Sequence, residues 1–328
     1  ITTYTYSQNK LLETLVNKRG TTTLSSFTMT NYDGARNLKS WSQTVTPPSS
    51  GPSGSLFQGV TTYTREAEST SSYKDRLIRE LSTRFAGYDE NNVYDAADNP
   101  TTFRGTSGLA FNANNQRTGT GYSYDGNGNP TTYASKAATY DDGNRLTSFP
   151  NIANTTWAAG YRADNLRSWT QASSSSTLSE RVYYYYDGGN AVLEKSNTGT
   201  LHAINVFAPD GLVARSFNPV LTNPGPEEED VQGMVGESYR GDYLFDWQGN
   251  ATHILSDAVW PAQGTLIHSA YNAWGQKNFL YPTNLNNELH RFGYNARWGY
   301  RTDTETGLVY CQNRYYDPAN GRWVTRDP

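Results

Sequence analysis

Short aromatic-rich segments alternate with polar turn segments along most of this chain. The clearest units span 122–133, 140–149 and 183–193, where a tyrosine run leads into Asp, Asn and Gly and then into a second strand-like run. This pattern predicts β-hairpins, because Asp-Gly and Asn-Gly allow the positive φ that tight hairpin turns demand. The tyrosine at the strand end also supplies a hydroxyl that can reach a neighbouring carbonyl or water.

The hairpin unit recurs at a nearly regular spacing. The aromatic residue before each turn stands at positions 124, 140, 161, 186, 207, 245, 271, 294 and 316, and most intervals are 16 to 26 residues. The longest interval contains the proline-rich acidic segment 218–230, which we expect to be an exposed loop. A period near twenty indicates a repeat architecture, in which each unit buries its face only by stacking on its neighbours.

Composition supports an all-β fold. Hydrophobic residues make up only 35% of the chain, while 25 tyrosines supply much of the bulk, and tyrosine and threonine favour strands. Leu77, Ile78 and Leu81 have helix-like spacing and leave a short helix open as an alternative there, although strand-like neighbours favour a strand.

Charge and motif content exclude several classes of function. The net charge of −4 and the lack of a basic run argue against nucleic-acid binding, and no apolar run approaches membrane-spanning length. The single cysteine excludes an intrachain disulfide. The four histidines are far apart in the sequence and show no metal-ligand spacing, so we expect neither a metal site nor a cofactor. These histidines are His202, His253, His268 and His290.

The last 28 residues are the most informative stretch. Two strand-like runs, 307–316 and 322–326, flank a polar turn. This residue pattern resembles the signature of the Rhs-associated core, which ends the shell of Rhs and YD-repeat proteins. The upstream tyrosine-aspartate units are similar to YD repeats. The matching residues, in order, are Thr306, Gly307, Leu308, Tyr310, Arg314, Tyr315, Tyr316, Asp317, Pro318, Gly321, Arg322, Trp323, Asp327 and Pro328.

The resemblance implies a spiralling sheet of successive hairpins that forms part or all of a hollow shell. Residues 1–236 would then be YD-repeat wall, and residues 237–328 would be the core-associated end, with its signature at 301–328. Shells of this family are usually much longer, so we expect a fragment that forms an open strip or part of a wall.

The family also suggests a self-cleavage site. Many members cut their own chain just beyond the core by an aspartate-based mechanism, and Arg326 and Asp327 match the arginine and the first aspartate of that site. An arginine beside a carboxylate would keep it ionised while a second carboxyl group holds the proton. The second aspartate lies further downstream in the family, so we do not expect these 328 residues to act as an enzyme alone.

We therefore expect a structural shell protein that encloses or carries a C-terminal polypeptide cargo, such as a toxin, for delivery to another cell. The family implies a bacterial protein that is secreted or at the cell surface. Two alternatives remain: an extracellular adhesion module whose exposed rings bind cell-surface glycans, and a surface structure assembled from further copies of the chain through its sheet edges.

Overall fold

The computed structural model describes residues 1–46, 58–66, 75–150, 156–174, 177–178, 180–217, 239–256, 265–281 and 288–325. Within these residues the regular structure is antiparallel β-strand apart from two 3-10 turns, η2 (Leu289–Arg291) and η3 (Ala296–Trp298). The predicted all-β fold of successive hairpins is confirmed. The chain divides into two compact units, unit 1 (Ile1–Thr120) and unit 2 (Gly121–Pro328).

In its described residues, unit 1 contains a seven-stranded antiparallel sheet whose strands are neighbours in chain order. Its strands are β1 (Thr2–Tyr6), β2 (Leu12–Arg19), β3 (Thr22–Tyr32), β4 (Leu38–Val45), β5 (Gln58–Arg65), β6 (Leu77–Ser82) and β7 (Tyr88–Asn91). A second sheet holds β8 (Val93–Tyr94), β9 (Pro100–Phe103) and β10 (Thr106–Ser107), and a third pairs β11 (Ala110–Phe111) with β12 (Arg117–Thr118). Because β6 is a strand, the alternative of a helix near residue 78 is wrong.

Unit 2 begins with a small sheet and continues as one long meander. The small sheet holds β13 (Ser123–Tyr124), β14 (Pro130–Tyr133) and β15 (Lys136–Ala137). The meander holds β16 (Thr139–Tyr140), β17 (Leu146–Pro150), β18 (Thr156–Tyr161), β19 (Arg167–Ser174), β20 (Thr177–Leu178), β21 (Val182–Asp187), β22 (Asn190–Ser196), β23 (Leu201–Ala208), β24 (Gly211–Phe217), β25 (Tyr239–Phe245), β26 (Ala251–Ser256), β27 (Thr265–Tyr271) and β28 (Lys277–Tyr281).

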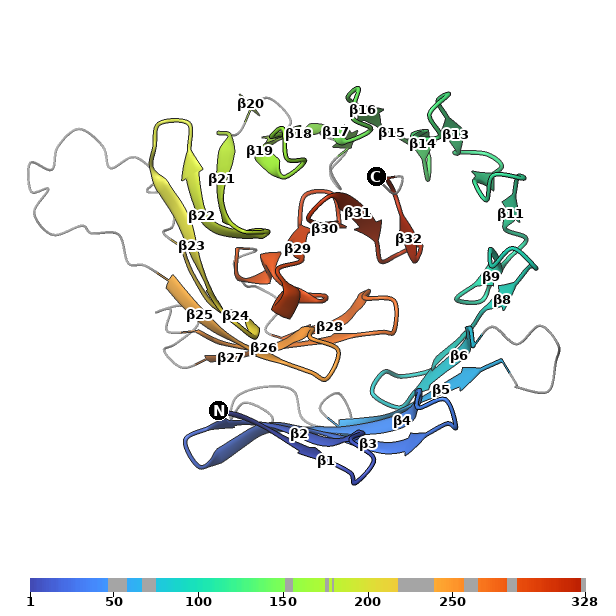
Figure 1. The fold of residues 1–328 in the computed structure, drawn as a ribbon, viewed down its shortest axis with the longest axis vertical. Helices are drawn as coiled ribbons and strands as arrows, with labels where there is room; N and C mark the ends of the chain where they lie inside the picture. The colour runs from blue at the N-terminus through green and yellow to red at the C-terminus, as the bar shows by residue number, and fades with distance from the viewer. Residues whose placement is uncertain are drawn as a thin grey trace, which may run out of the picture. The chain divides into compact units, whose positions relative to one another are not determined.

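The described end of the chain, residues 288–325, forms the C-terminal segment. It contains η2, η3 and a four-stranded sheet of β29 (Arg301–Asp303), β30 (Leu308–Cys311), β31 (Arg314–Asp317) and β32 (Arg322–Trp323). Figure 1 shows the meander of unit 2, in green to orange, curving around this red segment. The curved sheet therefore presents one face to the C-terminal segment.

A five-residue turn connects many of the hairpins. Its first residue is Asp or Asn, its side-chain Oδ1 accepts hydrogen bonds from backbone N–H groups further along the turn, and its fourth residue has positive φ. At the turn of residues 141–145, for example, Asp141 Oδ1 accepts from Gly143 N and Arg145 N, each at 3.0 Å. Such turns begin at Asp33, Asp95, Asn112, Asp125, Asp141, Asp246 and Asn272. Their short polar side chains hold the turn by local bonds to the backbone.

The predicted positive φ of Asp-Gly and Asn-Gly is confirmed at Gly188, with φ of 57°, and at Gly128, with φ of 86°, but not at every turn. In the turn 141–145 the residue with positive φ is Asn144, with φ of 58°, whereas Gly143 has ordinary φ. Asn tolerates the left-handed region because its short side chain bonds locally. The aromatic residue before the turn lies at a β-bulge, as at Tyr140 and Tyr161, which re-aims its side chain.

Several of these tyrosines donate a hydrogen bond to the preceding hairpin. Tyr161 donates to the Leu146 carbonyl at 2.5 Å, and Tyr186 donates to the Arg167 carbonyl at 2.9 Å. Tyr32 and Tyr94 do the same in unit 1. The predicted reach of the hydroxyl to a neighbouring carbonyl is confirmed.

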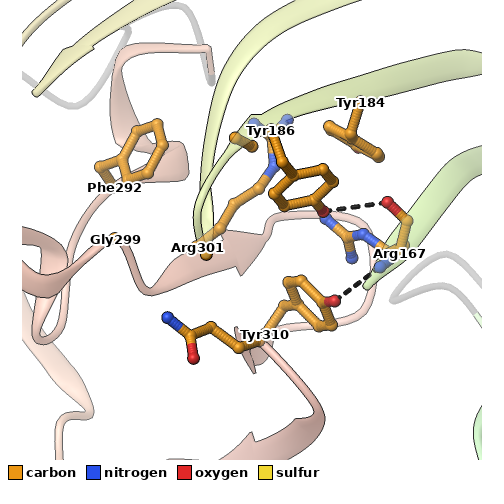
Figure 2. Close-up of a pocket in the computed structure, with 10 residues that line it drawn as sticks. Arg167, Tyr184, Tyr186, Phe292, Gly299, Arg301 and Tyr310 are labelled. Atoms are coloured by element: carbon orange, nitrogen blue, oxygen red, sulfur yellow. Dashed lines mark hydrogen bonds between the residues drawn. The ribbon is translucent and has the colours of Figure 1, made fainter. Parts of the chain in front are cut away.

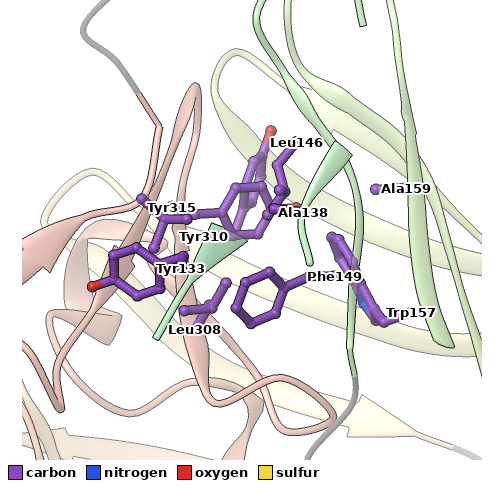
Figure 3. Packing of buried hydrophobic residues seen from close by; sticks show 10 residues of the cluster. Tyr133, Ala138, Leu146, Phe149, Trp157, Ala159, Leu308, Tyr310 and Tyr315 are labelled. Atoms are coloured by element: carbon purple, nitrogen blue, oxygen red, sulfur yellow. The ribbon is translucent and has the colours of Figure 1, made fainter. Parts of the chain in front are cut away.

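Two hydrophobic clusters join the curved sheet of unit 2 to the C-terminal segment. The first, drawn in Figure 3, consists of Tyr133, Ala138, Leu146, Phe149, Trp157, Ala159, Leu308, Tyr310, Tyr315 and Val324. The second consists of Ala203, Leu212, Phe217, Tyr243, Ala251, Ile254, Ile267, Leu289, Phe292 and Ala296. Because each cluster combines residues from the sheet with residues beyond 288, the C-terminal segment completes the core of unit 2.

The domain boundary predicted at residue 236/237 stays a prediction. The acidic segment 218–230 lies outside the described residues, and β24 pairs with β25 on either side of it. The part of the chain that the structure describes contains no helix with the length and apolar character needed to cross a membrane.

Candidate functional site

The candidate site is the contact between the C-terminal segment and the curved sheet. Most of the predicted signature residues lie in this segment, and three of them, Leu308, Tyr310 and Tyr315, are buried in the first hydrophobic cluster. The Tyr315 ring meets Trp157 of β18 edge-on, with ring centroids 5.6 Å apart. Burying an aromatic side chain contributes roughly 1.5–3 kcal/mol, so the signature rings help hold the segment in place.

The other signature residues shape the segment itself. Gly307 closes the β29–β30 turn with φ of 76°, and its N–H donates to the Asp303 carbonyl at 2.8 Å. Asp317 accepts a hydrogen bond from the N–H of Ala319 at 2.8 Å, which is a local bond within the turn that contains Pro318. Gly321, in the same turn, has φ of 60°.

Signature side chains also form a row of rings and a cation. Arg314 stacks over the half-exposed Trp323 ring at 4.0 Å. Tyr316 stacks on Tyr294 with centroids 5.8 Å apart, and its hydroxyl donates to the Trp274 carbonyl at 2.8 Å. Arg322 pairs with Asp317 across the β31–β32 ladder.

A buried ion pair connects the segment to β19. Arg167, wholly buried at the start of β19, donates through Nη1 to the Asp303 carboxylate and to the Tyr315 hydroxyl, the latter at 3.0 Å. The Arg167 backbone N–H donates to the Tyr310 hydroxyl at 2.8 Å. Tyr310 and Tyr315 therefore bond to the sheet through their hydroxyls and pack through their rings.

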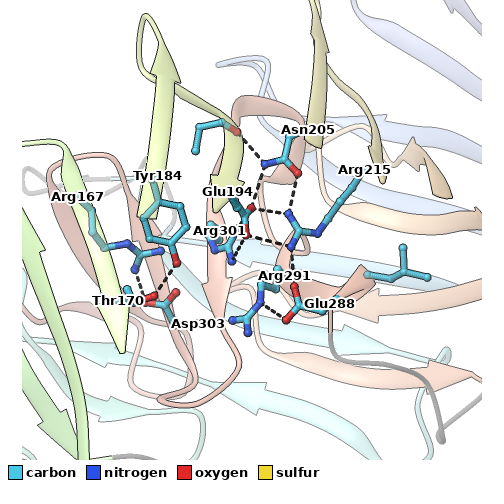
Figure 4. A network of polar contacts seen from close by, with 12 residues as sticks. Arg167, Thr170, Tyr184, Glu194, Asn205, Arg215, Glu288, Arg291, Arg301 and Asp303 are labelled. Carbon is cyan, nitrogen blue, oxygen red and sulfur yellow. Dashed lines mark hydrogen bonds and ion pairs between the residues drawn. The ribbon is translucent and has the colours of Figure 1, made fainter. Parts of the chain in front are cut away.

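A second buried centre is Glu194 of β22 (Figure 4). Its carboxylate accepts hydrogen bonds from Arg215 of β24 and from Arg301 of β29. Arg215 also donates to Glu288 at 2.6 Å. Arg291 donates to Glu288 at 2.8 Å and belongs, like Glu288, to the C-terminal segment.

Burial and these arginines act in opposite directions on the carboxylates. Burial alone would raise the pKa of Glu194, but Arg215 and Arg301 hold that pKa well below its usual range. Burial would also raise the pKa of Glu288, yet Arg291 and Arg215 lower it to about 2. These carboxylates therefore stay charged at neutral pH, and the network acts as a fixed electrostatic attachment.

A small cavity lies beside the network, between β19, β21 and β22 and the C-terminal segment (Figure 2). It offers about 10 Å³ to the centre of a water molecule, which is room for about one water. Its lining residues are Arg167, Tyr184, Tyr186, Gly189, Ala191, Phe292, Gly299, Arg301, Tyr310 and Gln312. This volume is too small for an organic substrate.

The predicted self-cleavage residues Arg326 and Asp327 lie outside the described residues, so their role stays a prediction. The described chain leads up to them along β31: Val324 N donates to the Tyr315 carbonyl at 2.8 Å, and Tyr315 N donates to Thr325 Oγ1 at 3.1 Å. Tyr140 donates to the Val324 carbonyl at 3.2 Å.

Two of the four histidines lie side by side in the structure. The β26–β27 register sets His253 opposite His268, and their buried rings stack with centroids 4.7 Å apart. These two histidines are therefore neighbours, although they are distant in sequence. No group of three or more His, Cys, Asp or Glu side chains suited to a metal occurs in the described parts of the chain.

The sequence reasoning missed the buried charges. Glu194 and Arg215 stand at strand positions whose neighbours in the same strand are largely apolar, whereas Arg167 begins a mostly polar strand. A charged residue at an inward position of an otherwise apolar strand is a usable signal, because such a residue needs a buried partner. The sequence alone did not show which partner it would have.

Comparison with curated proteins shows similarity to large WapA proteins. The chain is 26% identical over 228 residues to the tRNA3(Ser)-specific nuclease WapA of Bacillus spizizenii, and 26% identical over 227 residues to the tRNA nuclease WapA of Bacillus subtilis. Each alignment covers 68% of this chain and 8% of the relative. A shorter alignment, 38% identical over 72 residues, matches the putative uncharacterized protein YlbH of Escherichia coli and covers 22% of this chain and 28% of that protein. No protein-family model matches the chain.

Comparison with solved structures shows the fold of Tc toxin proteins. The crystal structures of TcdB2-TccC3 and of TcdB2-TccC3-Cdc42 each superpose with a TM-score of 0.71, at 17% and 16% identity. The Photorhabdus luminescens Tc holotoxin pore superposes with a TM-score of 0.70 at 16% identity. These matches cover 100% of this chain and 17% of each longer chain. At such identity the likeness establishes the fold alone.

Proposed function

We propose that this chain is part of an Rhs/YD-repeat shell that carries a polypeptide cargo following it in the same gene product. The observation that supports this most is the attachment of the C-terminal segment to the face around which the sheet of unit 2 curves, through two hydrophobic clusters and a network of buried ion pairs. A segment fixed there would lead the following residues toward the enclosed side of the wall.

The comparisons support the same reading at a coarser level. The chain shares its fold with Tc toxin proteins and a quarter of its aligned sequence with WapA nucleases, both much longer than this chain. We propose that this chain carries the cargo. We do not propose for it the nuclease activity that the name of WapA describes. Delivery to another cell also places the protein outside the cell that makes it, as a secreted or surface protein.

The proposal predicts that the following polypeptide resists protease. The natural gene product would be treated with proteinase K, and digestion of the part beyond residue 328 would be followed by mass spectrometry. We expect that part to survive as long as the shell is folded, and to be digested once the shell is denatured. Digestion at the rate of the same polypeptide expressed alone would contradict enclosure.

A pair of variants links protection to the site. Asp303→Asn leaves Arg167 buried without its carboxylate, whereas Asp164→Asn removes an exposed partner of Arg162. Protection should fall in the first variant and stay unchanged in the second, with folding of both checked by circular dichroism. Equal protection in both variants would show that the contact between the C-terminal segment and the curved sheet does not protect the cargo.

Adhesion and self-assembly stay alternative hypotheses. Many of the rings that could bind sugars are used in packing, as Trp157 and Tyr315 show, and cross-strand packing is the simpler role of such rings. Glycan binding by a protein without any enclosed polypeptide would favour adhesion. Association that depends on protein concentration would favour assembly with further copies.

A further inference from the structure

Two buried arginines border the small cavity of unit 2. Arg167 of β19 is wholly buried, and Arg301 of β29 is 4% exposed. Each arginine uses its Nη atoms for a carboxylate: Arg167 donates to Asp303, and Arg301 donates to Glu194. The buried Nε atoms of both arginines have no hydrogen-bond partner among the described residues. Buried charged donors are normally hydrogen-bonded, so these two Nε–H groups need an acceptor.

The cavity has room for one such acceptor. Arg167 and Arg301 both line it, and its volume fits about one water molecule or an ion of similar size. The guanidinium carbons of the two arginines lie 4.7 Å and 5.0 Å from the centroid of the same ring, that of Tyr184. Figure 2 shows both arginine side chains beside the rings of Tyr186 and Tyr310. Two cations therefore border a space that holds a single small particle.

The charges around the cavity favour an anion over a water molecule. The residues that line the cavity, all within the described chain, include two arginines and no Asp or Glu. The buried part of the described network contains three cations and two carboxylates, namely Arg167, Arg215, Arg301, Glu194 and Asp303. It therefore carries one excess positive charge. Glu288 and Glu305 lie nearer to solvent, with side chains 31% and 23% exposed, where water and salt screen their charges.

One end of the cavity lies at the protein surface. Gly189 and Gln312 both line the cavity, and both are exposed. A Cβ added at Gly189 would lie 2.6 Å from Gln312 Nε2, so the Gln312 amide rests against the Gly189 backbone. The amide nitrogen is a further hydrogen-bond donor. This end gives a small ion a path from solvent to the two arginines.

We propose that this cavity binds one small monovalent anion, of the size of chloride, through the Nε–H groups of Arg167 and Arg301. Hydrogen bonds between charged donors and an anion are stronger than those to a neutral acceptor. The anion would balance the excess positive charge and reduce the repulsion between the two guanidinium groups, whereas a water molecule would leave the charge unbalanced. The site does not depend on what the wall carries.

The stability of unit 2 tests for the anion. Urea unfolding of the protein would be followed by circular dichroism in mixtures of sodium chloride and sodium gluconate at constant total salt. Gluconate is too large for the cavity, and constant salt keeps general screening equal. A ligand that binds only the folded state stabilises that state. We therefore expect the unfolding equilibrium constant to fall up to about tenfold for each tenfold rise in chloride above its dissociation constant.

A charge at the exposed end links this effect to the cavity. Gln312→Glu keeps the size of the side chain but places a carboxylate where it repels an anion. It should raise the apparent dissociation constant of chloride by about three- to tenfold, the range for two charges partly screened by water. Asn313→Asp is the matched control, because it adds the same charge at the neighbouring exposed residue, which does not line the cavity. Its effect should stay below about twofold.

Bromide locates the ion. Crystals grown with sodium bromide in place of sodium chloride should show an anomalous difference peak beside the Nε atoms of Arg167 and Arg301, and a weaker peak in Gln312→Glu. Equal stability in chloride and in gluconate, or an equal loss of chloride affinity in both variants, overturns the proposal. Bromide found only on the protein surface, with a water molecule alone in the cavity, overturns it as well.

Discussion

Arg167 and Asp303 are 136 residues apart in the chain, yet they form a pair that is almost wholly buried. Desolvating two charges is expensive, and only the pairing and added hydrogen bonds compensate for it. Arg167 gains such bonds from its contact with the Tyr315 hydroxyl. No local pattern indicates a partner at this separation, which is why sequence reasoning did not find the pair.

Removing one partner should be costly. Asp303→Asn is expected to lower the free energy of unfolding of unit 2 by ~3–5 kcal/mol, because it leaves a buried guanidinium uncompensated. Asp164→Asn, which breaks an exposed pair with Arg162, should cost ~0–1 kcal/mol. Urea unfolding followed by tryptophan fluorescence compares the two, and a similar small loss in both would contradict the role given to Asp303.

Two groups in the C-terminal segment make the stability of unit 2 depend on pH. Burial, together with nearby Lys277, lowers the pKa of His290 from 6.5 to about 3. The folded state therefore favours the neutral imidazole, and this contribution is full above pH 6.5 and lost as the pH falls toward 3. Glu288, with its pKa lowered from 4.5 to about 2, contributes fully above pH 4.5 and loses that contribution as the pH falls toward 2.

These windows separate the two groups experimentally. His290→Gln should flatten the fall in unfolding free energy between pH 6.5 and 4.5, where the change from this group is on the order of 2 kcal/mol. Glu288→Gln should flatten the fall below pH 4.5 and leave the upper window unchanged. Unfolding midpoints in urea, measured across this pH range, give both slopes. Unchanged slopes in the variants would show that neither group titrates as described.

At the scale of the element, the hairpins follow from local chemistry. An aromatic strand end, then Asp or Asn, then a residue that accepts positive φ lie within six residues, so the sequence pattern predicts both the turns and their spacing. The glycine after the aspartate has the expected positive φ at Gly188, whereas in the turn 141–145 Asn144 adopts the left-handed conformation instead. Bulges and the tyrosine bonds between hairpins depend on the neighbouring hairpin. The sequence therefore predicted only that a tyrosine hydroxyl can reach a neighbouring carbonyl or water.

Removing a single hydroxyl group tests the hydrogen bond that a tyrosine donates to the preceding hairpin. Tyr161→Phe removes the hydroxyl that donates to the Leu146 carbonyl and should cost ~1 kcal/mol of unfolding free energy, more if that carbonyl is left unpaired. Tyr185→Phe is the control, because the Tyr185 side chain is half exposed and its change should stay within ~0.5 kcal/mol. Equal effects would mean that the hydroxyl bond between hairpins adds little to the wall.

At the scale of the whole molecule, the C-terminal signature indicated the fold and pointed to the C-terminal segment, where the candidate site lies. It did not indicate that the segment would complete the core of unit 2, because that depends on contacts such as Tyr315 with Trp157 and Arg301 with Glu194, each formed across more than 100 residues.

The most direct test of the carrying role is native mass spectrometry of the natural gene product, reading its termini and every polypeptide that stays bound. We predict a chain that continues past residue 328 and a downstream polypeptide, cleaved or intact, that remains with the wall. If cleavage has occurred, Asp327→Asn should abolish it. A natural product with no polypeptide beyond the segment, and nothing bound, would contradict the carrying role and leave adhesion or assembly in its place.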